Sequence, residues 1–270
     1  MTPRGFGISS LAWPAEAWRD ALRLVRELGM SAIEVAPFDV FKSWDASDDD
    51  VRALRSELAG AGMTCTAMQG ILYQAPQVHL FASTEARAAL RAHLAKVARI
   101  AGLLGAKACV FGAPRQRDPG TLTPAQAWDV AIEFFRDVAP VFADHGAAIA
   151  FEANARRYGC RFVVTTREAV ELVAQVGHPG CGLQIDTGTL LLEGEDPQVL
   201  RAAAPLAVHA HVSEPDLAPI GSSGVDHAPI AAALRASGYA GSLSIEMKSV
   251  PDWPSAVARA VALVRGTYAP

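Results

Sequence analysis

The sequence has few cysteines, no excess of positive charge and no long apolar run, and each shortage excludes a class of protein. Its four cysteines among 270 residues show no CxxC spacing, so neither a disulfide framework nor a cysteine zinc site is expected. The net charge of −4 and a pI near 6.0 argue against a surface for nucleic acid or anionic lipid. No stretch approaches the ~18 apolar residues of a membrane span, and residues 1–10 lack the pattern of a signal peptide. We expect a soluble, cytoplasmic protein with reduced thiols.

Two further absences bear on the fold. The GxGxxG turn of a doubly wound, dinucleotide-binding sheet does not follow the first expected strand. No low-complexity linker interrupts the chain, and proline and glycine lie between the expected elements, where turns need them. The sequence therefore predicts a single domain over residues 1–270.

Short apolar segments alternate with longer amphipathic ones along the chain. The short segments predict eight strands, at residues 6–12, 32–36, 65–71, 108–112, 148–154, 182–186, 208–212 and 243–247. The amphipathic segments predict helices at residues 14–28, after 47, around 90–104, after 123, after 165, and at 196–204, 226–236 and 254–265. Thr123 with Gln126, and Thr165 with Glu168, have the spacing of a capping box. Strict alternation of eight strands and eight helices closes most simply as one α/β domain, a (β/α)8 TIM barrel.

Four consecutive expected strands end on a side chain that can bind a metal. These residues, from the fifth strand to the eighth, are Glu152, Asp186, His211 and Glu246. Side chains alternate along a strand and neighbouring strands lie about 4.8 Å apart, so four inward ligands at matching height can converge on one ion. Three carboxylates and one imidazole predict one divalent metal ion at the C-terminal mouth of the barrel, with Mn²⁺ first and Mg²⁺, Co²⁺ or Zn²⁺ as alternatives.

A structural role is the alternative for these four residues. A single Glu or His near a strand end is more often hydrogen-bonded or solvent-facing than a ligand, and the four could form a salt-bridged cluster. Three carboxylates on one inward face repel one another strongly unless a cation neutralises them, which favours the metal site.

A metal at this place predicts proton-transfer chemistry. It can hold neighbouring oxygens of a hydroxy-ketone and lower the pKa of the proton between them, while Glu152 and Glu246 act as base and acid on opposite faces. This predicts a metal-dependent epimerase or isomerase of a keto-sugar or polyol ketone, working through a metal-bound enediolate. A lyase, either a dehydratase or a keto-glycoside-cleaving enzyme, shares the first step and is the alternative. Product mass separates the two.

The chain resembles the sugar phosphate isomerase/epimerase superfamily, the xylose-isomerase-like TIM barrels that include D-tagatose 3-epimerase-type enzymes. The resemblance spans nearly the whole chain and is most specific at Phe151-Glu152-Ala-Asn154, Asp186-Thr187, His211-Val-Ser-Glu214-Pro and Ile245-Glu246. It implies Glu152, Asp186, His211 and Glu246 as metal ligands, and the two glutamates as the catalytic acid–base pair.

Three positions depart from the ketohexose 3-epimerases that the chain resembles. Tyr158 stands where those enzymes carry a Glu, Thr189 where they carry a His, and Leu217 where they carry an Arg. Those groups hold the carbonyl end and the hydroxyls of the substrate. The resemblance therefore carries over the chemistry, but not free fructose, tagatose or psicose as the substrate.

Candidate substrate contacts are Gln69, Asn154, His209 and Lys248. Gln69 ends the inward face of the third strand, and Asn154 belongs to the motif after the fifth. Lys248 lies two residues past Glu246 and so on the same face, where it could touch substrate or pair with Glu34 or another carboxylate. His209 is expected one layer deeper, as a buried hydrogen-bonding residue. The connection at residues 214–225 is expected to serve as a substrate loop.

Two other function classes are weaker. A DNA-repair nuclease of related barrel ancestry needs several metals, more histidine ligands and a basic groove, and seven histidines with a net charge of −4 argue against it. A catalytically inactive binding protein conflicts with an intact set of four ligands. The partners expected are a small-molecule sugar and, as an option, further copies of the chain in a homo-oligomer, with no nucleic acid and no membrane.

Overall fold

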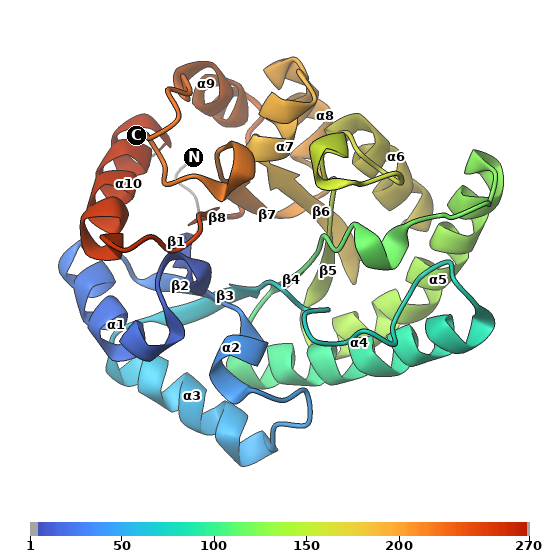
Figure 1. The fold of residues 1–270 in the computed structure, drawn as a ribbon, viewed down its shortest axis with the longest axis horizontal. Coiled ribbons are helices and arrows are strands. Elements are labelled where there is room, and N and C mark those ends of the chain that lie inside the picture. The colour runs from blue at the N-terminus through green and yellow to red at the C-terminus, as the bar shows by residue number, and fades with distance from the viewer. Residues whose placement is uncertain (1–4, 269–270) are drawn as a thin grey trace.

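The computed structural model describes residues 5–268, which form a closed barrel of eight parallel strands surrounded by helices (Figure 1). The strands follow one another around the barrel in chain order, and the last pairs with the first. They are β1 (Gly5–Ser9), β2 (Ala32–Val35), β3 (Thr64–Met68), β4 (Ala108–Phe111), β5 (Ala148–Glu152), β6 (Cys181–Asp186), β7 (Ala207–Val212) and β8 (Ser242–Ile245). The predicted (β/α)8 TIM barrel is confirmed.

Helices connect the strands around the outside of the barrel (Figure 1). They are α1 (Trp18–Glu27), α3 (Asp48–Gly60), α4 (Thr84–Leu104), α5 (Pro124–Asp144), α6 (Thr166–Val176), α8 (Leu200–Ala203), α9 (Ala228–Ala236) and α10 (Trp253–Tyr268). Two short helices that the sequence did not predict, α2 (Pro37–Phe41) and α7 (Thr187–Leu192), follow β2 and β6 almost directly. Within residues 5–268, no helix has both the length and the apolar content that crossing a membrane requires.

Side-chain caps fix where three of the longer helices begin. Ser47, Thr123 and Thr165 each accept a hydrogen bond from the backbone N–H three residues on, and the side chain at that position bonds back to the backbone N–H of the cap residue. The two predicted capping boxes are therefore present, and Ser47 forms a third with Asp50. Each N-cap typically stabilises its helix by ~1 kcal/mol.

Six of the eight strands end one to three residues earlier than predicted, and in β3 and β8 this places Gln69 and Glu246 just beyond the ladder. β3 ends at Met68 rather than at residue 71, and β8 ends at Ile245 rather than at residue 247. The backbone N–H groups of both residues still donate to the neighbouring strand, Gln69 to the Val35 carbonyl at 3.0 Å and Glu246 to the Val212 carbonyl at 3.0 Å. The rim therefore keeps the strand direction for one more residue.

The inside of the barrel divides into an apolar half and a polar half. Small apolar side chains on β3, β4 and β5 pack together as a separate cluster: Ala67, Ala108, Val110 and Ala150. Buried polar side chains from β2, β6, β7 and β8 fill the other half: Glu34, Gln184, His209, His211 and Ser244. Burying titratable side chains such as Glu34, His209 and His211 is costly, and buried titratable groups gather at functional sites. The polar half is therefore where a functional site is expected.

Candidate metal centre

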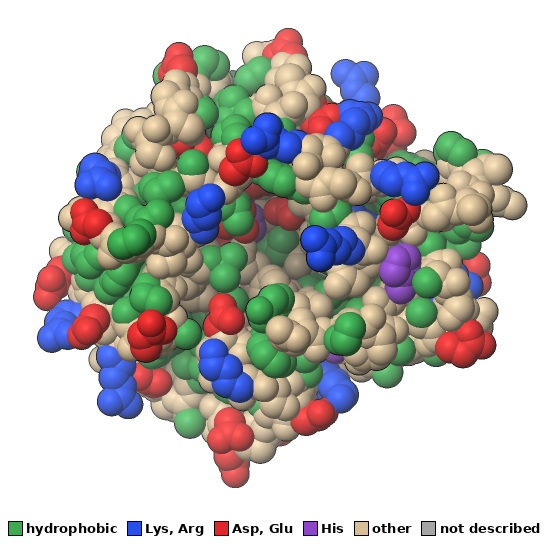
Figure 2. All heavy atoms as spheres, viewed as in Figure 1, with side chains coloured by type: hydrophobic (Ala, Val, Ile, Leu, Met, Phe, Trp, Pro, Cys, Tyr) green, Lys and Arg blue, Asp and Glu red, His purple; other side chains and the backbone are tan. Residues whose placement is uncertain are grey.

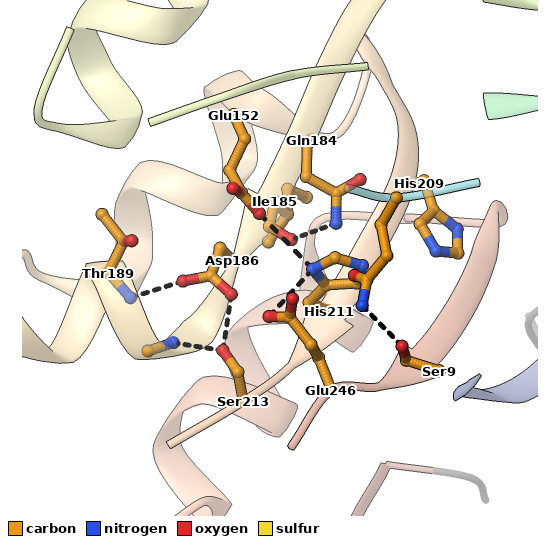
Figure 3. A network of polar contacts seen from close by, with 12 residues as sticks. Ser9, Glu152, Gln184, Ile185, Asp186, Thr189, His209, His211, Ser213 and Glu246 are labelled. Atoms are coloured by element: carbon orange, nitrogen blue, oxygen red, sulfur yellow. Dashed lines mark hydrogen bonds and ion pairs between the residues drawn. The ribbon is translucent and has the colours of Figure 1, made fainter. Parts of the chain in front are cut away.

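Four side chains at or directly after the ends of the last four strands meet at the C-terminal mouth of the barrel (Figure 3). They are Glu152, Asp186, His211 and Glu246, and one ligand atom of each lies within 4.8 Å of those of the other three. Two ligands on opposite sides of a divalent ion, each at about 2.2 Å, are about 4.4 Å apart. The four side chains that the sequence predicts as ligands are thus brought together at a spacing that suits one ion.

The orientation of His211 supports a cation at the centre of the cluster. Its Nε2 lies 2.9 and 3.0 Å from the two carboxylate oxygens of Glu34. Its Nδ1 faces Glu152 Oε1 at 3.4 Å and Glu246 Oε2 at 3.3 Å, yet it is buried and makes no hydrogen bond of good geometry to any described residue. A neutral imidazole that donates from Nε2 to Glu34 directs the lone pair of Nδ1 at this point, as metal-binding histidines do.

The charges of the cluster favour bound positive charge. Burial raises the pKa of Glu246 to about 7, with the charges of Glu152 and Asp186 adding to the rise and His211 opposing it. Burial and the charge of Glu152 raise the pKa of Asp186 in the same way. Burial opposes protonation of His211, but Glu34 and Glu246 outweigh it and raise its pKa well above the usual value. A divalent cation would compete with protons for these groups and would neutralise the carboxylates.

Asp186 is held at both of its carboxylate oxygens. One oxygen caps α7 by accepting a hydrogen bond from the Thr189 backbone N–H at 2.6 Å. The other accepts from the Ser213 hydroxyl at 2.5 Å, and that hydroxyl in turn accepts from the Gly188 N–H at 2.9 Å. These contacts, drawn in Figure 3, fix the carboxylate before any ligand arrives.

Glu152 is oriented through a buried arginine. The Asn154 side-chain amide donates from Nδ2 to Glu152 Oε2 at 2.8 Å, and its Oδ1 accepts from Arg117 Nη2 at 3.1 Å. Arg117 also donates to the Glu152 backbone carbonyl at 2.7 Å and lies over the Phe151 ring at 4.8 Å. The arginine side chain is fully buried, so its charge acts on the site with little screening.

A close approach at Gly112 leaves room for the same carboxylate. A Cβ atom at this position would lie 2.6 Å from Glu152 Oε2 and 3.2 Å from Asn154 Oδ1 of the side-chain amide. Only glycine at the end of β4 therefore lets the Glu152 carboxylate occupy its place.

A cleft in two compartments opens over the cluster, and Figure 2 shows it as a hollow near the middle of this face. We call the smaller part, of about 300 Å³, the Tyr73 compartment; its walls include Gln69, Tyr73 and Gln116. The larger part, of about 420 Å³, is the Tyr158 compartment. Glu152 and Glu246 line both parts. Tyr158, Thr189 and Leu217, the three positions that depart from the ketohexose 3-epimerase pattern, all line the Tyr158 compartment.

The predicted substrate contacts divide into two groups. Gln69 lines the Tyr73 compartment and Asn154 lines the Tyr158 compartment. His209 lies deeper: it is fully buried, and its Nδ1 is 2.5 Å from the Ser242 hydroxyl. The Lys248 side chain is exposed and lines neither compartment. Its considered pairing with Glu34 is wrong, because Glu34 binds the two histidines instead.

Sequence reasoning missed Glu34 and Arg117 as parts of this site. Glu34 carried a signal, since it is the one charged residue in the buried strand Ala-Ile-Glu-Val. Arg117 carried none, because it lies in a polar segment, Arg-Gln-Arg-Asp, that reads as an exposed loop. Its burial depends on the fold of residues distant in sequence.

The structure is similar to several solved structures. It superposes on D-psicose 3-epimerase from Clostridium cellulolyticum H10 with a TM-score of 0.83 and 20% identity, covering 98% of this chain and 100% of that chain. It superposes on 3-keto-D-glucoside 4-epimerase from E. coli with a TM-score of 0.79 and 16% identity, covering 97% of this chain and 99% of that chain. It superposes on an AP endonuclease, family 2, from Brucella melitensis with a TM-score of 0.78 and 19% identity, covering all of both chains. At such identities the likeness concerns the fold alone.

Sequence comparison identifies the family. No curated protein matches the chain. The family described as "Xylose isomerase-like TIM barrel" matches residues 22–266, which is most of the chain and includes all four residues of the cluster. The chain therefore belongs to the xylose isomerase-like TIM barrel family.

Proposed function

We propose that this protein is a divalent-metal-dependent epimerase or isomerase of a keto-sugar. The observation that carries the proposal is the cluster of three carboxylates around His211 Nδ1, which is buried and makes no hydrogen bond to the described residues. Two structural neighbours are named as epimerases of keto-sugars, D-psicose 3-epimerase and 3-keto-D-glucoside 4-epimerase, which supports the same class of reaction here.

Glu152, Asp186, His211 and Glu246 would hold the ion, and three oxygen ligands with one nitrogen favour Mn²⁺. When bound, a divalent ion polarises neighbouring carbonyl and hydroxyl oxygens and so makes the C–H between them more acidic. Asp186, whose two carboxylate oxygens accept hydrogen bonds from the Thr189 N–H and the Ser213 hydroxyl, would serve as a fixed ligand.

Glu152 and Glu246 would move the proton. Glu152 ends β5 and Glu246 directly follows β8, and both border the two compartments of the cleft. One carboxylate removes the proton from the carbon that bears the hydroxyl, and an enediolate results. The other returns a proton to the opposite face of the same carbon, which inverts that centre. Alternatively, it protonates the neighbouring carbon while the hydroxyl proton passes to the former carbonyl oxygen, which shifts the carbonyl.

The test is solvent-proton exchange. Metal-reconstituted protein is incubated with a panel of keto-sugars in D₂O, and deuterium at the carbon beside the carbonyl is followed by NMR and mass spectrometry. We expect metal-dependent uptake in the wild type, a loss of at least 100-fold in Glu152→Gln and in Glu246→Gln, and no loss in Glu171→Gln, which changes an exposed residue of α6.

Conservation of substrate mass would identify an isomerase or epimerase, while loss of water or of an aglycone would identify a lyase. Absence of deuterium uptake with every keto-sugar, from protein shown to hold one metal per chain, would overturn the proposal.

A further inference from the structure

The cleft over the cluster offers two adjoining compartments, each with room for a ligand group. Ligand pockets span about 300–1,000 Å³, and each compartment alone, at about 300 and about 420 Å³, reaches that range. Ala113, Glu152 and Glu246 border both, so the acid–base pair lies at the junction. A substrate that reacts between the two glutamates can therefore extend into both compartments.

Each compartment presents an exposed aromatic side chain. Tyr73, at 56% exposure, and Tyr158, at 38%, are the two large hydrophobic side chains that stand exposed in residues 5–268. Each one lines a different compartment of the same cleft. Exposed aromatic surface beside a polar reaction centre is typical of ligand contact, because an aromatic face can stack against the apolar face of a ring.

The loop that carries Tyr73 is held in place by contacts from Trp44, Phe38 and His93. The Trp44 indole N–H donates to the Tyr73 carbonyl at 2.8 Å, and the Phe38 ring meets the Tyr73 ring edge-on at 5.7 Å. His93 Nε2 lies 2.6 Å from the Ile71 carbonyl, two residues earlier. A ring held in this way loses little conformational freedom when a ligand stacks on it.

The side chains of the two compartments select different chemical groups. Apart from the shared glutamates, no charged side chain lines the Tyr73 compartment within residues 5–268. Leu11, Ile71, Leu72 and Val110 form apolar walls beside the amides of Gln69 and Gln116. The described residues that line it include no Lys or Arg that would bind a phosphate or carboxylate. The Tyr158 compartment adds Asp186, Asn154, Thr189 and Ser213, which suit a ring rich in hydroxyl groups.

We propose that the substrate is an uncharged keto-glycoside with two parts. The keto-sugar ring occupies the Tyr158 compartment beside Asp186, and a second ring, joined through the glycosidic oxygen, stacks on Tyr73. The inference rests on the proposed function, since it takes the carboxylate cluster as the reaction centre. It makes Tyr73 a specificity-determining residue. The second group must be a neutral ring with an apolar face, a requirement that an aromatic ring and a sugar ring both meet.

The experiment compares one keto-hexopyranoside as its methyl, phenyl and glucosyl glycosides on the full chain loaded with Mn²⁺. Dissociation constants are measured by calorimetry, and proton exchange in D₂O is measured in parallel. We expect both ring-bearing glycosides to bind about tenfold or more tightly than the methyl glycoside. We expect Tyr73→Ala to remove most of that difference and Tyr73→Phe to keep it. Gln77→Ala changes an exposed residue of the same loop outside the cleft and should alter neither value.

The outcomes separate this inference from the proposed function. Tighter binding of the ring-bearing compounds without proton exchange would uphold the Tyr73 compartment and refute the reaction. Proton exchange with equal affinity for all three glycosides would uphold the reaction and overturn the inference. Failure of all three to bind the metal-loaded protein would overturn the inference as well. A difference between glycosides that survives in Tyr73→Ala would show that another surface holds the second ring, and would likewise overturn it.

Discussion

Replacing Gly112 by alanine should weaken metal binding while leaving the fold intact. The added Cβ would lie 2.6 Å from Glu152 Oε2, where an ordinary van der Waals contact begins at about 3.4 Å. The Gly112 backbone is not in the left-handed region, so alanine can adopt it, and the clash is confined to the carboxylate and the Asn154 amide. The Glu152 carboxylate must therefore move away from β4.

The size of this movement sets the expected loss. A binding constellation tolerates displacements of only ~0.5 Å, and the oxygen must retreat from 2.6 to about 3.4 Å. We expect Mn²⁺ affinity to fall about 10- to 100-fold, the range seen when groups that orient metal ligands are changed. The free energy of unfolding of the metal-free protein should change by less than about 1 kcal/mol, because the atom that moves is the end of a side chain at the rim.

The assay is calorimetric titration of metal-free protein with Mn²⁺, together with urea unfolding. Gly266→Ala is the matched control, since Gly266 is an exposed residue of α10 with no atom within 4 Å of its added Cβ. The control should keep its Mn²⁺ affinity and gain up to ~1 kcal/mol of stability. Wild-type Mn²⁺ affinity in Gly112→Ala would refute the role assigned to the Glu152 carboxylate.

Three further predictions concern the surroundings of the cluster. Glu34→Gln removes the charge that binds His211 Nε2, so Mn²⁺ affinity measured by chelator competition should fall about 10- to 100-fold; an unchanged value would contradict this. Arg117→Met leaves the buried carbonyls of Glu152 and Val163 without a donor, so the free energy of unfolding in urea should fall by about 2–4 kcal/mol. Arg117→Lys should recover only part of this free energy; full recovery would show that charge alone matters. The raised pKa values of Asp186, Glu246 and His211 mean that the folded metal-free protein binds protons more tightly than the unfolded chain, with Glu246 shifted from 4.5 to about 7. This stabilisation is lost as pH rises from about 5 to 8, so the Tm gap between metal-loaded and metal-free protein should widen over that range; a constant gap would count against these shifts.

The fold could be predicted because each local signal agrees with the whole. Thr123 and Thr165 begin helices where their capping boxes predict, and the short apolar segments form the eight strands. The four clustered side chains could be predicted for the same reason. In a parallel barrel, residues at the carboxyl ends of consecutive strands point inward at matching height.

The surroundings of the cluster could not be predicted, because they depend on contacts between distant parts of the chain. Glu34 meets His211 across 177 positions of sequence, and no local pattern specifies that pairing. The short helices α2 and α7 contain too few residues to show a helical period. The two compartments are formed by loops such as 69–75 and 213–217, whose paths depend on tertiary contacts from residues such as Trp44 and Arg157.

The most direct test of the central claim is the position of a bound ion in a crystal of the Mn²⁺-reconstituted protein, located by anomalous scattering. The account predicts one strong anomalous peak per chain at about 2.0–2.3 Å from His211 Nδ1 and from a carboxylate oxygen of each of Glu152, Asp186 and Glu246. A peak elsewhere, or no peak in crystals grown with excess Mn²⁺, would contradict it.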